Sequence, residues 1–377
     1  MINEEAASVS TVPRPGMAPL MSAALRRAIA AADGWLPFDR YMAIALYEPG
    51  VGYYARGSGQ FGAMPASGSD FVTAPELSGL FGATLAVQLR QALVAAESAD
   101  VYEFGAGSGA LAECLLTELG SACQHYFIVE LSGALHEQQR QRLQRFGARV
   151  HWLDRLPERM TGAVIGNEVL DAMPVQLLHF DGARWFERGV AWQGPGLVWA
   201  DRATSLRPPI DDTSDTTFAP GTVTEIHTQA QAFVRTLAER LARGAAFFID
   251  YGFPEAEYYH RQRVGGTLMC HRGHLMDDNP LVDVGDKDIT AHVNFSAIAL
   301  AAQDAGLDVA GYTSQARFLF NCGLAERLER ADARTRARAL KLVAEHEMGE
   351  LFKVVALSRG LHWQPIGFVA GDRSHRL

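Results

Sequence analysis

The chain has 377 residues, of which 48% are hydrophobic and 20% are charged, a balance typical of globular proteins that bury a substantial core. Its net charge is −9 and it contains no block of lysine or arginine, which argues against nucleic acid as the main partner and suits a cationic substrate. Four cysteines without a C-x-x-C pair predict reduced thiols, and we expect no membrane span, because no apolar stretch approaches the ~18 residues that a bilayer requires.

Residues 1–19 carry three prolines and no apolar segment, which predicts a loose arm that is neither a secretory signal nor a transit peptide. We therefore expect a protein of the bacterial cytoplasm. Helical patterns follow over residues 20–32 and 80–96. The glycine-rich loop between them, over residues 57–68, is either a lid beside an active site or an ordinary surface loop.

A short strand, a glycine turn and a helix come next. The turn has glycines at alternate positions, namely Gly105, Gly107 and Gly109. Glycines let the backbone turn sharply and approach a ligand, and a turn between a strand and a helix N-terminus forms a nucleotide-type binding edge. The spacing fits three readings: a loose dinucleotide fingerprint ending at Ala110, the Glu-x-Gly-x-Gly-x-Gly turn of S-adenosylmethionine-dependent methyltransferases beginning at Glu103, or a turn without a ligand. An acidic residue at Glu103 favours the second, because the sulfonium and ammonium groups of that cofactor are cationic.

Two further strands, over residues 125–129 and 148–153, each end in an acidic residue. Glu130 is placed to bind the two ribose hydroxyls of an adenosine, a device that NAD enzymes and methyltransferases share. Asp154 either faces the adenine amino group or is an ordinary turn residue.

The fourth strand, over residues 162–166, runs into Asn-Glu-Val-Leu-Asp-Ala-Met-Pro at residues 167–174. Open α/β sheets hold their active sites just past the carboxyl ends of their strands. Methyltransferases acting on nitrogen commonly place Asn or Asp and a proline here to hold the N–H groups of the acceptor, whereas a dehydrogenase has no such need. In the alternative reading, Asp171 caps a helix and Asn167 lies in a turn.

The remaining elements complete the chain. A hairpin is predicted around Asp181-Gly182, with strands over 175–180 and 184–192, followed by a surface loop over 200–221. An amphipathic helix over 225–243 leads into a fifth strand over 245–249, and closing strands are predicted over 307–312 and 352–357. Cys270, His271 and His274, with His260 nearby, lack a second pair at zinc-site spacing, so we expect no metal.

Taken in order, seven blocks of this chain resemble the MidA-like family of class I methyltransferases, whose mitochondrial members assist respiratory complex I assembly by methylating an arginine. The blocks lie at residues 38–54, 70–82, 103–109, 167–174, 249–252, 288–295 and 347–354. One position departs from the family pattern, because Ser69 stands where a glycine is usual. A serine there would be strained if the backbone required positive φ.

The resemblance implies an α/β fold, with a Rossmann-like seven-stranded class I methyltransferase sheet, a helical N-terminal extension and inserted hairpin and loop segments. The order of the predicted elements divides the chain into a substrate-side helical region (1–98), the first, S-adenosylmethionine-binding part of the core (99–171), an insertion (172–225) and a second part of the core with acceptor-side loops (226–377). The resemblance also implies S-adenosylmethionine as cofactor and an arginine of a protein as acceptor, with a respiratory complex I subunit as one candidate. A small-molecule methyltransferase and a non-catalytic assembly factor that keeps the cofactor fold are the alternatives.

The expected cofactor site consists of Glu103, Gly105, Gly107, Gly109, Glu130, Asp154 and Asn167. Two carboxylates can grip a guanidinium through bidentate hydrogen bonds, so Glu168 and Asp171 are the first candidates for the catalytic site. Glu76, Asp250 and His292 are further candidates, from blocks that return to the cofactor. His292 could accept the released proton.

Overall fold

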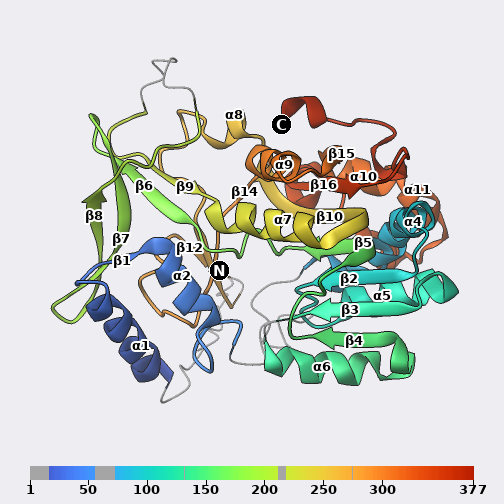
Figure 1. Ribbon diagram of the computed structural model, residues 1–377, viewed down its shortest axis with the longest axis horizontal. Helices are drawn as coiled ribbons and strands as arrows, with labels where there is room; N and C mark the ends of the chain where they lie inside the picture. Colours follow the sequence, from blue (N-terminus) through green and yellow to red (C-terminus); the bar gives the residue numbers. More distant parts are fainter. Residues whose placement is uncertain (1–16, 56–72, 131, 211–217, 274) are drawn as a thin grey trace, which may run out of the picture.

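The computed structural model describes residues 17–55, 73–130, 132–210, 218–273 and 275–377. The described chain forms two regions, a central sheet with its covering helices and a smaller antiparallel sheet that carries the first two helices (Figure 1). The predicted glycine-rich loop at 57–68 and Ser69 lie outside the described residues.

The central sheet has the strand order β15-β16-β10-β5-β2-β3-β4, with a short β14 beside β10. Strand β16 alone runs antiparallel to its neighbours. The strands are β2 (Asp100–Phe104), β3 (His125–Val129), β4 (Val150–Leu153), β5 (Met160–Asn167), β10 (Leu241–Phe253), β14 (Val293–Asn294), β15 (Asp308–Ser314) and β16 (Phe352–Arg359). This arrangement confirms the predicted Rossmann-like sheet of seven principal strands.

The register of the parallel strands aligns their carboxyl ends. Phe104 at the end of β2 pairs with Val129 of β3 on one side and with Gly166 of β5 on the other. The residues at this level of the strands therefore lie along one edge of the sheet: Gly105, Glu130 and Asp154 directly follow β2, β3 and β4, Asn167 is the last residue of β5, and Asp250 follows Ile249, which pairs with Asn167. Strand β2 is also where the chain turns from one half of the sheet to the other, which is the usual place for a ligand in an open α/β sheet.

Helices cover both faces of the central sheet. One face carries α4 (Gly79–Ala96), α5 (Ala110–Leu119), α6 (Gly133–Leu143), α10 (Gln315–Asn321), α11 (Leu324–Arg330) and α12 (Ala333–Leu340). The other carries α7 (Thr228–Arg240) and α9 (Phe295–Asp304). Because successive strand residues point to opposite faces, Phe247 of β10 enters the first apolar cluster and Phe248 enters the second. Strand β10 is consequently apolar on both sides.

Helix α4 corrects one expectation drawn from the sequence. Its 18 residues are long and apolar enough, by length and composition, to cross a membrane, and it is the one such helix in the described part of the chain. It is 61% buried, however, and it packs against β5, β10 and α5. Ser78 caps its N-terminus by accepting the N–H of Leu80 (3.3 Å). Its place in the core accounts for its apolar composition.

The second region is built on an antiparallel sheet of β1 (Leu36–Pro37), β6 (Gln176–Phe180), β7 (Trp185–Gln193), β8 (Gly196–Ala203) and β9 (Val223–Ile226). Helices α1 (Met17–Ala31) and α2 (Phe38–Tyr47) pack on it. The predicted hairpin is confirmed, with Gly182 at φ 102° in its turn. A three-stranded sheet of β11 (Met269–Arg272), β12 (Leu275–Asp277) and β13 (Asp288–Thr290) and two single-turn helices, α3 (Ala74–Leu77) and α8 (Glu255–Tyr258), complete the described α-helices and strands.

Two predicted elements have different limits. The surface loop predicted from residue 200 begins later, because β8 continues to Ala203, which pairs with Phe186 of β7. The helix predicted from Glu225 starts at Thr228, because Glu225 lies in β9. The buried Glu225 carboxylate accepts the N–H of Thr267 (2.7 Å), and this distant contact holds that segment in the sheet.

Candidate functional site

The glycine turn lies directly after β2. Gly105, Gly107 and Gly109 have φ values of 63°, 53° and 80°, a region that favours glycine. The N–H of Gly105 donates to the carbonyl of Val129 at 3.0 Å, which joins the turn to the end of β3. A Cβ on Gly105 would lie 3.0 Å from Cγ2 of Val169, so the turn also abuts the loop that follows β5.

Gln139 of α6, which sequence reasoning missed, organises the cofactor side of this edge. Its Nε2 donates to the carbonyl of Gly107 (2.9 Å) and to Oε2 of Glu130 (3.3 Å), while its Oε1 accepts from Nε1 of Trp152 (2.9 Å). The other oxygen of Glu130 accepts the N–H of Ser132 at 3.0 Å. Gln139 is fully buried, so it ties the turn, the ends of β3 and β4 and Glu130 into one rigid unit. No motif marks it, because its partners come from three separate strand ends.

The two other predicted cofactor carboxylates have different environments. Glu103 is buried within β2, and its Oε2 accepts from the hydroxyl of Tyr126 at 2.8 Å. Burial raises the pKa of Glu103 to about 8, against the lowering effect of the Tyr126 hydrogen bond. Asp154 is exposed just beyond β4, so the structure places it at the rim of the edge.

Asp250 shapes the loop that follows β5. Its Oδ2 accepts the N–H groups of Val169 (3.2 Å), Leu170 (2.9 Å) and Asp171 (3.3 Å), and its Oδ1 accepts that of Tyr251 (3.0 Å). Burial, with the neighbouring acidic charges of this loop, raises its pKa well above the ordinary value. Both oxygens of this catalytic candidate accept main-chain N–H groups, and Asp250 thereby holds the loop that follows β5.

The same loop, residues 167–171, which we call the acceptor loop, presents oxygen atoms. Nδ2 of Asn167 donates to Oε1 of Glu168 at 2.9 Å, and the hydroxyl of Tyr251 donates to Oδ2 of Asp171. Among the described residues no partner reaches Oδ1 of Asn167 or Oδ1 of Asp171, although both atoms are buried. Glu168 adopts φ 53°, a strained conformation of the kind often found at functional sites. A ligand rich in N–H donors fits such a loop.

The carboxyl groups of the acceptor loop titrate at unusually high pH. Burial, followed by the charge of Asp171, raises the pKa of Glu168 to about 8. Burial raises the pKa of Asp171 to about 6, although the hydrogen bond from Tyr251 opposes that shift. Near pH 7, acids with such pKa values are present in both the protonated and the ionised form, as acid–base groups in active sites are.

Two tyrosines bring the second region to the acceptor loop. The hydroxyl of Tyr47, at the end of α2, donates to the carbonyl of Ala172 at 2.8 Å. Tyr54 stacks on Tyr47 with ring centroids 5.6 Å apart, and its hydroxyl lies 2.9 Å from both oxygens of Asp288. Sequence reasoning gave these tyrosines no role, and their place in the resembling blocks was the signal that could have found them.

His292 packs against two aromatic rings of β10. Its ring centroid is 5.0 Å from that of Tyr251 and 5.3 Å from that of Phe253. Burial lowers the pKa of His292 to about 4, so its ring is neutral at pH 7. Its Nδ1 is buried without a partner in the described structure. His292 can therefore accept a hydrogen bond in this site but is a weak base.

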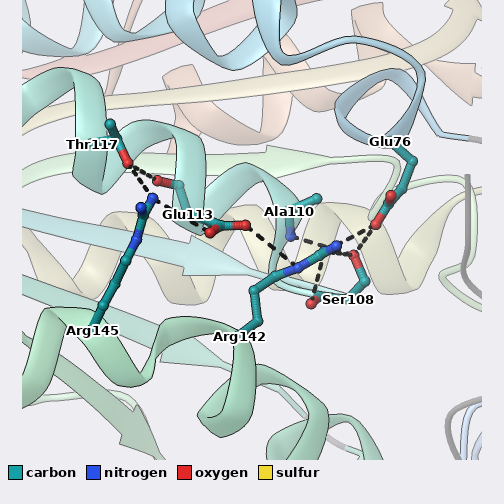
Figure 2. Close-up of polar contacts among 7 residues, drawn as sticks. All are labelled: Glu76, Ser108, Ala110, Glu113, Thr117, Arg142 and Arg145. Atoms are coloured by element: carbon teal, nitrogen blue, oxygen red, sulfur yellow. Dashed lines mark hydrogen bonds and ion pairs between the residues drawn. The ribbon is translucent and has the colours of Figure 1, made fainter.

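Glu76 lies apart from the other catalytic candidates. Figure 2 shows its carboxylate, carried by α3, against Ser108 of the glycine turn and Arg142 of α6. The structure therefore places Asp171 and His292 against Tyr251, with Glu168 near enough to Asp171 for their charges to interact, and it places Glu76 with the glycine turn.

The cysteine and histidine segment lies in the small sheet. Cys270 is buried in β11, and burial raises the pKa of its thiol to about 12. His274 is outside the described residues, and within those that are described no group of three or more His, Cys, Asp or Glu side chains could hold a metal ion.

Known proteins were compared with this chain. Residues 80–313 match a family described as S-adenosyl-L-methionine-dependent methyltransferases. A Burkholderia thailandensis protein crystallised with S-adenosyl-homocysteine is 50% identical and covers 97% of this chain and 99% of its own, with a TM-score of 0.93. The mitochondrial protein arginine methyltransferase NDUFAF7 of Danio rerio is 27% identical, over 85% of this chain and 83% of that protein. The Caenorhabditis elegans homolog is 26% identical, over 79% and 75%.

The residues present fit this cofactor. A turn of three glycines leaves room for it at the end of β2, and Glu130 stands at the end of the next strand, where ribose hydroxyls bind in such sheets. The buried carboxylate of Glu103 lies beneath the turn, where a cationic ligand would stabilise its ionised form. Fold, site and similarity agree, and the chain belongs to the family of S-adenosyl-L-methionine-dependent methyltransferases.

Proposed function

We propose that this methyltransferase transfers the methyl group to a guanidinium nitrogen of an arginine in a protein. The observation that carries the proposal is a pair of buried oxygens, Oδ1 of Asn167 and Oδ1 of Asp171, which no donor of the described residues reaches and which lie beside the carboxyl group of Glu168. A guanidinium offers five N–H donors in a planar fork and no acceptor, so it complements oxygen atoms of this kind.

S-adenosylmethionine supplies a methyl group on a sulfonium that leaves as a neutral thioether. The chain must then align the nitrogen with the sulfur–methyl axis and exclude water. Glu168 and Asp171 hold the guanidinium, and their charges draw its positive charge away from the nitrogen that attacks. A bound cation also lowers the pKa of both carboxyl groups, so the substrate itself favours their ionised forms.

Methylation of a guanidinium releases one proton, because both the substrate and the product carry a single positive charge. The proton passes from the attacking nitrogen to a carboxylate of the acceptor loop. Glu168, whose pKa is about 8, is better matched to this step near neutral pH than His292, whose pKa is about 4.

The names of the curated relatives support a protein arginine as the acceptor, because NDUFAF7 and its homologs are called protein arginine methyltransferases. A subunit of respiratory complex I is one acceptor that we propose to test. The four cysteines are free in the structure, which suits a reducing compartment such as the bacterial cytoplasm.

The test uses S-adenosylmethionine with a labelled methyl group, the purified protein and bacterial lysate proteins, and the label is identified after acid hydrolysis. We expect methylarginine in protein. Asp171→Asn should reduce labelling at least about tenfold while binding of S-adenosylhomocysteine stays within about twofold of wild type. Label confined to small molecules would identify a small-molecule methyltransferase. Cofactor binding without any labelling would favour a non-catalytic assembly factor.

A further inference from the structure

Ser108 lies at the centre of a buried polar cluster behind the glycine turn (Figure 2). Its hydroxyl oxygen accepts the N–H of Ala110 (3.3 Å) and a hydrogen bond from Nη1 of Arg142 (2.6 Å). Neither of these groups can accept a proton, so the hydroxyl donates its own to Oε1 of Glu76. The serine hydroxyl therefore makes every hydrogen bond available to it, and its orientation is determined by two side chains from other elements.

Arg142 and Glu76 also hold each other. Nη1 of Arg142 lies 3.1 Å from Oε1 of Glu76 and 3.1 Å from the carbonyl oxygen of Ser108. The carboxylate of Glu76 is nearly buried, at 9% side-chain exposure, so water screens this pair weakly. Charge-assisted hydrogen bonds in such a setting are stronger than neutral ones.

A second carboxylate provides an internal comparison. Glu113 lies 3.6 Å from Nε of Arg142 and 3.4 Å from Nη2 of Arg145, with 37% of its side chain exposed. Figure 2 shows Glu113 on the side of Arg142 that faces away from Ser108. Both acids thus pair with the same arginine, but Glu76 alone of the two also holds Ser108.

Helix α3, which carries Glu76, reaches the acceptor loop as well. The backbone of Ala74 at its first residue lies close enough to Glu168 to lower the pKa of that carboxyl group. One turn of helix thus lies between the glycine turn and the acceptor loop.

We propose that Glu76 and Arg142 are positioning residues, which clamp Ser108 and thereby hold the glycine turn in the shape that binds the cofactor. The clamp is tested by the affinity for the cofactor alone, so the test is independent of which acceptor the enzyme methylates. A fault in the arginine proposal would leave this result unchanged.

The experiment measures binding of S-adenosylhomocysteine to the full chain by calorimetry, with the thermal midpoint of each variant recorded with and without that ligand. Glu76→Gln and Arg142→Met should each weaken binding about tenfold, because each removes a charge-assisted contact to Ser108. Arg142→Lys should recover part of the loss. The matched control Glu113→Gln should stay within about twofold of wild type. The midpoint without ligand should change little, while the rise on adding ligand should shrink.

A double variant separates the clamp from general damage. In a Ser108→Ala background, Glu76→Gln should have little further effect on affinity, because both changes remove the same contact. Additive losses, wild-type affinity in Glu76→Gln, or an equal loss in Glu113→Gln would each overturn the proposal. Ser108→Ala removes one oxygen atom, so it keeps the test decisive if a larger change prevents folding.

Discussion

The glycine turn and the acceptor loop follow neighbouring strands, yet the polar side chains at the two places differ in their hydrogen bonding. At the glycine turn, Gln139 and Ser108 make hydrogen bonds through every polar side-chain group. In the acceptor loop, Asn167 and Asp171 each keep one buried oxygen without a donor from the described chain.

Under the proposed function, the difference follows from what each part recognises. A cofactor that is the same in every turnover is best met by a preorganised main-chain turn, with side chains that lock it from behind. A substrate that carries N–H donors binds best to oxygen atoms that accept hydrogen bonds. The burial of these oxygens raises the pKa of the carboxyl groups among them. Four experiments test this difference.

The largest effect should come from Gly107→Val. A β-branched residue is strained at φ 53° and would place methyl groups at the cofactor turn, so affinity for S-adenosylhomocysteine should fall at least about 100-fold, or about 2.7 kcal/mol. Gly194→Val is the control, because Gly194 has φ 56° in a hairpin turn and a Cβ there would meet no atom within 4 Å. Calorimetry should find normal affinity in the control. Equal losses would mean that backbone strain, and not the turn, is responsible.

The next effect distinguishes Asp171 of the acceptor loop from Asp250 of β10, which holds that loop. Asp250→Asn turns an amide N–H₂ toward main-chain donors, and the free energy of unfolding should fall by about 2–4 kcal/mol. Asp171→Asn keeps an oxygen for Tyr251 and should cost less than about 1 kcal/mol, although it should reduce methyl transfer. Urea denaturation of both proteins measures the difference. A destabilisation as large in Asp171→Asn would show that Asp171 also has a structural role.

The pH profile of methyl transfer reports on the same carboxyl groups. A carboxyl group holds a cation only when ionised, and burial raises the pKa values of Asp171 and Glu168 to about 6 and about 8. We therefore expect kcat/KM to rise between about pH 6 and pH 8. Glu168→Gln should flatten the upper part of that rise. A profile without slope in this window would contradict the assigned role of Glu168.

The smallest effect concerns the stability of the protein without cofactor. The pKa of Glu103 is about 8 in the folded chain and ordinary in the unfolded chain, so the folded state holds this proton more tightly. Its contribution to stability is complete below the ordinary value of 4.5 and is lost as the pH rises through about 8. Glu103→Gln lacks that loss, so its thermal midpoint should exceed the wild-type midpoint by a few degrees more at pH 8.5 than at pH 5. Equal differences at both pH values would contradict burial as the cause.

Some parts of the predicted site depend on residues that are neighbours in the sequence, and others depend on contacts between distant residues. The glycine turn could be predicted from the sequence, because positive φ at alternate positions calls for glycine. The positions of Glu130, directly after β3, and of Asn167, the last residue of β5, could be predicted because both strands are apolar. Asp181 and Gly182 likewise predicted their hairpin, since a tight turn depends on its own residues.

The other side chains of the site are brought together by tertiary contacts. Tyr47 reaches a carbonyl 125 positions away, Glu76 meets a serine 32 positions away, and Asp250 holds a loop some 80 positions earlier. Such contacts leave no periodic trace, because the pattern of a strand or helix reports its own backbone and burial and not the partner across the fold. The sheet register brings these partners together, and long-range packing thereby places Glu76 beside the glycine turn and Asp171 beside Tyr251.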